Sequence, residues 1–86
     1  MFLTERKRQL LRALHAGGQD AATLSARFDT PMTIVREDLR DLRSYQLLTS
    51  YQARVDGRTI EVWELTERGR RHIAHIQQLE LRGIRA

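Results

Sequence analysis

The dipeptide Asp56-Gly57 separates two segments rich in β-branched and aromatic residues, 49–55 and 59–65, and it strongly constrains the fold. Asp-Gly between two such runs is the strongest short-range signal for a β-hairpin with a two-residue turn. A chain of 86 residues builds only one modest core. The rest of the chain is therefore expected to pack against the base of this hairpin.

Three helical segments are predicted before the hairpin. Thr4 is a suitable N-cap for the first helix, and Asp20 for a second, short one. The segment 29–31 ends the second helix and starts a third, with Thr30 as its N-cap and Pro31 at its first helical position. Two capped helices joined by such a short turn form a helix-turn-helix unit.

A last helix is predicted after the hairpin, capped by Thr66. A three-helix core is too small to cover all of its apolar residues, so we expect a dimer contact along it. The candidate dimerisation residues are Ile73, Ile76, Leu81 and Ile84. The alternative, a helix folded back on its own domain, stays open. This pattern divides the chain into residues 1–65 and a C-terminal helix at 66–86.

The charge of the chain is unevenly distributed. The net charge is +4 and the isoelectric point is near 10.6. Residues 1–16 and 66–86 each carry +3, whereas residues 17–65 carry −2. A basic balance suggests a polyanionic partner, nucleic acid before membrane. The two ends are expected to supply general attraction to phosphate.

The third helix sorts its charges onto separate faces. At about 100° per residue, its basic residues and one threonine fall on one stripe, and its acidic residues fall on another. The basic stripe contains Thr33, Arg36, Arg40 and Arg43. The acidic stripe contains Glu37, Asp38 and Asp41. Arginine suits bidentate contact with guanine in the major groove. The alternative is a solvated helix whose own charges pair along its surface.

The hairpin has two unlike faces. Leu48, Trp63 and Leu65 at its base are expected to complete the core. Arg54 and Arg58 near the tip are candidates for contact with phosphate or the minor groove, although a solvated role stays open. The opposite face is also apolar, through Tyr51, Ile60 and Val62. Either a bulge resets the register, or that face packs on the last helix or a second subunit.

Several motifs resemble those of bacterial regulators. The run from Val35 to Leu42, Val-Arg-Glu-Asp-Leu-Arg-Asp-Leu, resembles the recognition helix of DeoR-type repressors. The wing residues Asp56-Gly57-Arg58 and the run Leu65-Thr66-Glu67-Arg68-Gly69 resemble MarR and PadR regulators. The sequence departs from these patterns at Gln46, where the families have glycine, and at Glu37, where the DeoR pattern has arginine.

The resemblance implies a mainly α fold with a small β-hairpin, the winged helix. This fold has a three-helix helix-turn-helix core, a two-stranded wing and a C-terminal helix. It implies binding to double-stranded DNA through Thr33, Arg36, Arg40, Arg43, Ser44, Arg54 and Arg58. No ligand-sensing segment follows in this sequence, so no small-molecule effector is expected.

Other function classes find little support in the sequence. Without cysteine, the chain cannot form disulfides or use thiol chemistry, which fits a reducing, cytoplasmic setting. No apolar run spans a bilayer, and residues 1–8 do not resemble a signal peptide. His72 and His75 have no carboxylate at a matching spacing. We expect no metal, no cofactor and no enzymatic activity.

These observations favour a small bacterial or phage transcriptional regulator, a repressor that binds a pseudo-palindromic DNA site as a homodimer at the nucleoid. Two alternatives stay open. One is an architectural accessory protein of the excisionase kind, with weak sequence preference. The other is a protein-interaction winged helix that does not bind DNA, which the −2 charge of residues 17–65 favours.

Overall fold

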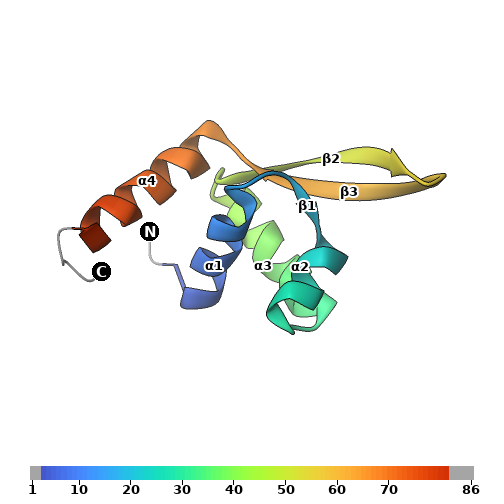
Figure 1. The fold of residues 1–86 in the computed structure, drawn as a ribbon, viewed down its shortest axis with the longest axis horizontal. Helices are drawn as coiled ribbons and strands as arrows, with labels where there is room; N and C mark the ends of the chain where they lie inside the picture. The colour runs from blue at the N-terminus through green and yellow to red at the C-terminus, as the bar shows by residue number, and fades with distance from the viewer. Residues whose placement is uncertain (1–2, 82–86) are drawn as a thin grey trace.

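The computed structural model describes the backbone of residues 3–81 and the side chains of residues 3–78. Three helices come first, then a long hairpin and a final helix (Figure 1). The helices are α1 (Glu5–Leu14), α2 (Ala21–Phe28), α3 (Met32–Ser44) and α4 (Glu67–Leu81). The strands are β1 (Gln19–Asp20), β2 (Leu48–Val55) and β3 (Arg58–Leu65). The predicted winged-helix architecture is confirmed.

The helix starts follow the predicted caps, with one exception. The Thr4 hydroxyl accepts from the Lys7 amide in α1, and the Asp20 carboxylate accepts from the Thr23 amide in α2. The N-cap of α3, however, is Pro31 and not Thr30, and no side chain caps that helix. The Thr30 hydroxyl instead donates to the carbonyl oxygen of Phe28.

The hairpin has the register expected from the sequence. Every pair from Val55↔Arg58 to Leu48↔Leu65 forms across β2 and β3. Both turn residues have positive φ, 50° at Asp56 and 75° at Gly57, as a type I′ turn requires. Of the two alternatives left open for the apolar outer face, the bulge is excluded, because the paired strands run in register from base to tip.

The two-stranded wing forms as predicted, and the sheet has a third strand that was not predicted. The short strand β1 pairs antiparallel with β3, so β3 lies between β1 and β2. A two-residue strand is too short to show a period in the sequence. It attaches only the base of the hairpin to the helices. Beyond it, the hairpin projects alone to one side (Figure 1).

The turn between α1 and β1 covers part of the second apolar face of the hairpin, the one that carries Tyr51, Ile60 and Val62. A Cβ atom on Gly18 would lie 2.8 Å from Val62 Cγ1 and 3.5 Å from the Tyr51 hydroxyl. The Tyr51 side chain remains 48% exposed. This face therefore packs on a backbone turn of its own domain over its inner part only.

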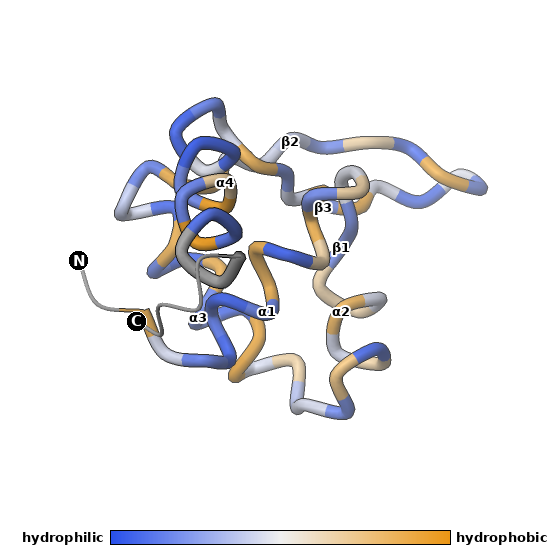
Figure 2. The backbone as a smooth tube through the Cα atoms, turned by 60° about the vertical axis from the view of Figure 1, so that its left-hand side comes forward, coloured by the Kyte–Doolittle hydropathy of each residue, from blue (hydrophilic) through white to orange (hydrophobic). Residues whose placement is uncertain are grey.

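One core joins the helices and the hairpin base. Its buried residues come from all four helices, from both strands of the hairpin, and from Leu3 and Leu47 outside these elements. Leu48, Trp63 and Leu65 are among them, as predicted. Figure 2 shows hydrophobic and hydrophilic segments alternating along the backbone of the helices. The core thus fixes α3 against the base of the wing.

The first turn of α4 docks on the junction between α3 and β2. The Thr66 amide donates to the Leu47 carbonyl oxygen, and the Thr66 hydroxyl donates to that of Gln46. Gln46 has φ +65°, the left-handed conformation that favours glycine, although a glutamine stands here. The buried Gly69 lies against Leu47. The start of α4 is therefore folded back on its own domain.

Candidate nucleic-acid interface

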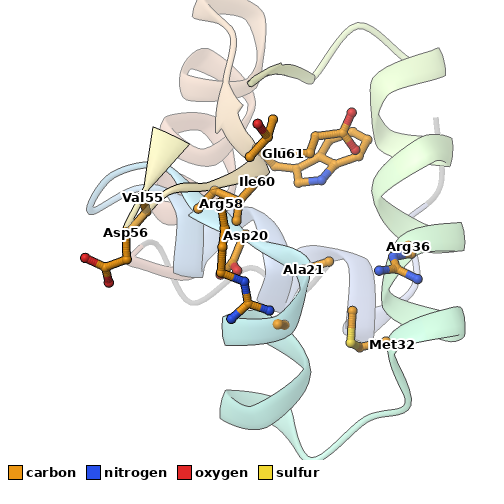
Figure 3. A pocket seen from close by; sticks show the side chains of 12 residues that line it. Asp20, Ala21, Met32, Arg36, Val55, Asp56, Arg58, Ile60 and Glu61 are labelled. Carbon is orange, nitrogen blue, oxygen red and sulfur yellow. The ribbon is translucent and has the colours of Figure 1, made fainter. Parts of the chain in front are cut away.

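An open groove of about 560 Å³ separates the start of α3 from the outer part of the hairpin. Its apolar lining includes Met32, Val55, Ile60 and Trp63. Arg36 enters it from α3, and Arg58 from β3 (Figure 3). Asp20, Asp56 and Glu61 also line the groove, so its charge is mixed. One arginine of the helix stripe, Arg36, and one of the wing, Arg58, thus line the same groove.

Arg36 and Arg40 are exposed on the outer surface of α3, as the stripe predicts. In the part of the chain that the structure describes, neither guanidinium has a hydrogen-bond or ion-pair partner. The alternative of charges paired along the helix surface is not observed for these two residues. Thr33, on the first turn of the same helix, is exposed as well. All three side chains are available to a ligand.

Two of the three residues of the acidic stripe, Asp38 and Asp41, pair with α1. Arg6 donates through both Nε and Nη2 to the Asp38 carboxylate, which is only 3% exposed. Lys7 Nζ lies 3.1 Å from Asp41 Oδ2 and 5.8 Å from the centre of the Tyr45 ring. The hydrogen bond and charge of Asp38 raise the pKa of Arg6, and those of Asp41 raise the pKa of Lys7.

The sequence led us to expect that the basic N-terminal segment attracts phosphate, but the structure gives two of its cations another role. Arg6 and Lys7 neutralise two carboxylates of α3 and are not free to attract phosphate. The sequence placed the acidic stripe correctly but did not identify its partners. Two adjacent cations on the polar side of α1 were the available signal. As a result, α1 neutralises Asp38 and Asp41 on the acidic side of α3, while Arg36 and Arg40 on its basic side stay exposed to solvent.

Replacing Arg6 with alanine is expected to cost about 1–2 kcal/mol of unfolding free energy. The buried Asp38 carboxylate would lose a charged, two-point partner. The loss stays below that of a fully buried pair because the Arg6 side chain is 51% exposed. Asp38→Asn, which removes the buried charge as well, is the matched control and should cost less. Equal losses in urea unfolding of the two variants would contradict this assignment.

Two predicted contact residues on α3 are already engaged with their own chain. Arg43 Nη1 donates to Ser50 Oγ at 3.2 Å, and its guanidinium carbon lies 5.0 Å from the centre of the Trp63 ring. The Ser44 hydroxyl donates to the Asp41 carbonyl oxygen at 2.6 Å. These residues lie at the end of the stripe, but their contacts distinguish them from Arg36 and Arg40.

The remaining predicted residues fall at the hairpin tip and along α4. Arg54 and Arg58 are exposed on the outermost paired positions of the hairpin. Ile73 is 2% exposed in the core of its own domain, so it offers no surface to a second subunit. Ile76 is half-buried. The Leu81 side chain and Ile84 lie outside the described residues.

The paired histidines of α4 differ in environment. Burial lowers the pKa of His72, and the neighbouring His75 adds to the effect. Among the described side chains no group of three or more histidine, aspartate or glutamate residues is arranged to hold a metal ion. Within the same residues no helix is long and apolar enough to cross a membrane.

No protein-family model and no curated protein matches the chain in sequence. Solved structures do resemble it. Lactococcus lactis ZitR, described as a zinc-responsive MarR family member, is 26% identical with a TM-score of 0.71, covering 91% of this chain and 56% of ZitR. The transcriptional regulator BldR from Sulfolobus solfataricus is 20% identical with a TM-score of 0.81, covering 94% and 57%. A ZitR mutant in complex with DNA is 23% identical with a TM-score of 0.71, covering 90% and 55%.

These similarities show that the chain has the winged-helix fold of such regulators. The chain spans little more than half the length of each of these neighbours. They do not bear on the DeoR-type pattern of α3, which remains a resemblance in sequence.

Proposed function

We propose that the chain binds double-stranded DNA in a sequence-specific way and acts as a transcriptional regulator. Residues 1–65 would form the DNA-binding domain. In this proposal α3 enters the major groove, where Arg36 and Arg40 contact base edges. Arg54 and Arg58 at the hairpin tip contact the adjacent backbone or minor groove.

The observation that carries the proposal is the pair of exposed arginines without partners on α3. Elsewhere in the described structure Arg6 pairs with Asp38 and Arg8 with Glu5. Within the same described residues Arg36 and Arg40 have no such partner, and their helix face borders a groove that Arg58 also enters. A similar fold has been solved in complex with DNA in the ZitR mutant, which supports the same partner here.

We further propose that the regulator is a homodimer that represses by occupying promoter DNA in the cytoplasm. A two-fold dimer would present two copies of α3 about one DNA turn apart. The contact would involve α4 beyond its docked first turns, with Ile76, Leu81 and Ile84 as the candidate residues. Light scattering at tens of micromolar tests the dimer separately from DNA binding.

The test of DNA binding is selection from random duplexes, followed by titration of the selected site at several salt concentrations. Contact with phosphate by several arginines predicts that the logarithm of the binding constant falls linearly with that of salt, with a slope of about −4 or steeper. An enriched pseudo-palindrome supports a dimeric regulator. A diffuse A·T preference would support an architectural protein instead. No enrichment and no salt-dependent binding would refute the proposal and leave a protein-interaction module.

A further inference from the structure

Arg43 links the end of α3 to the base of the wing. Its Nη1 donates to Ser50 Oγ on β2 at 3.2 Å, and its guanidinium lies over the Trp63 ring of β3 at 5.0 Å. Ser50 and Trp63 are directly opposite each other in the hairpin register. The Trp63 residue is 2% exposed, so the ring that the guanidinium covers is anchored in the core. One side chain of α3 thus touches both strands at the same level.

We propose that Arg43 is a positioning residue that sets the angle of the hairpin relative to α3, and that it does not read bases. This proposal rests on the proposed DNA-binding function. A planar guanidinium can stack on an indole ring and donate to a hydroxyl at the same time. Lysine has a flexible stem and a point charge, so it cannot reproduce this paired geometry.

Because the Arg43 contact lies at the base of the hairpin, a small change there moves the tip of the wing by a larger distance. Outside the hairpin, β3 pairs with β1 only at Val62 and Trp63, so the outer hairpin has no other strand beside it. Trp63 and Arg58 are five steps apart along β3, a length of about 16 Å. A rotation of about 10° at the base would therefore move the tip by about 3 Å, the scale of a hydrogen bond. Contact by the tip arginines depends on this angle.

The experiment measures the angle in the free protein, before any DNA is added. The chain has no cysteine, so Glu37→Cys and Thr59→Cys place two spin labels at exposed sites on α3 and the outer hairpin. We expect one narrow distance distribution in the parent. It should broaden or shift by about 2–3 Å in Arg43→Ala and in Arg43→Lys, and less in Ser50→Ala. Arg40→Ala, an exposed arginine without a partner, is the matched control and should leave it unchanged.

Emission from Trp63, the single tryptophan, supplies a second readout without labels. Removing the guanidinium exposes the ring to water, so Arg43→Ala should shift the emission to longer wavelength. A residue that only contacts DNA would move neither signal in the free protein. Unchanged distances and emission in both Arg43 variants would overturn the proposal. If Arg43→Ala fails to fold, Arg43→Lys decides the outcome, because it keeps the charge and the stem.

A DNA titration completes the test. With the selected site, Arg43→Lys should weaken binding by about two- to fivefold and lose protection of the DNA under the wing, while protection under α3 persists. Loss of sequence preference without a change in the free-protein distances would show instead that Arg43 reads a base. If the parent binds no DNA, the proposed function fails, and the distances still decide whether Arg43 sets the wing angle.

Discussion

Gly69→Ala is expected to lower the free energy of unfolding by about 2 kcal/mol and Tm by about 10 °C. A Cβ atom at this position would overlap the carbonyl oxygen of Leu47, which is a backbone atom and cannot rotate away. That oxygen already accepts the Thr66 amide. The helix must therefore move off the junction, or the junction must deform.

Whether Gly69→Ala lowers or raises stability distinguishes the steric overlap with Leu47 from an effect of helix propensity. Alanine is favoured over glycine in a helix by about 1 kcal/mol, so propensity alone predicts that Gly69→Ala stabilises α4. Thermal unfolding followed by circular dichroism measures the net result. A higher Tm in the variant would show that α4 does not lie as close to Leu47 as the structure has it. Ala74→Gly on the exposed side of α4 calibrates the propensity term in the same helix.

The close approach at Gly69 also bears on the proposed dimer. It fixes the direction in which α4 leaves the α3–β2 junction, since Thr66 and Arg68 both bond to Gln46 there. If the outer part of α4 dimerises, this direction sets the distance between two copies of α3. A variant that folds but docks α4 differently would then alter the preferred half-site spacing.

The hairpin shows what local sequence rules can predict. Its turn type follows from Asp56-Gly57, and the register follows from the turn, because a two-residue loop leaves no freedom in the pairing. The caps at Thr4 and Asp20 are equally local. Pro31 shows the limit of such a rule. The proline serves as N-cap itself, and Thr30 bonds backward to α2.

The remaining features depend on residues far apart in the chain. Helical periodicity placed Asp38 on an acidic stripe, but only the packing of α1 on α3 brings Arg6 to it. The same holds for Arg43: helical periodicity puts it on one stripe with Arg36, but the tertiary structure places it over Trp63. The strand β1 exists only because β3 is beside it. The sequence therefore predicts which face of α3 carries the arginines. It does not predict which of these arginines are free and which contact the rest of the chain.

Arg36→Ala and Arg40→Ala are each expected to weaken binding to the selected DNA site by about tenfold or more. Loss of one bidentate base contact corresponds to about 1–3 kcal/mol of discrimination. Both side chains are exposed and without partners in the described structure, so their removal should change unfolding free energy by no more than about 0.5 kcal/mol. The loss is therefore one of binding and not of folding.

Two controls separate base contact from bulk charge. Arg71→Ala removes one exposed positive charge from α4, away from the groove, and should change affinity less than twofold. Arg58→Ala should weaken binding to all sequences alike and make the salt slope shallower by about one. In contrast, Arg36→Ala and Arg40→Ala should relax the sequence preference at particular base positions. Unchanged affinity in both α3 variants would remove α3 from the DNA interface, because no other arginines on that helix are exposed without a partner in the described chain.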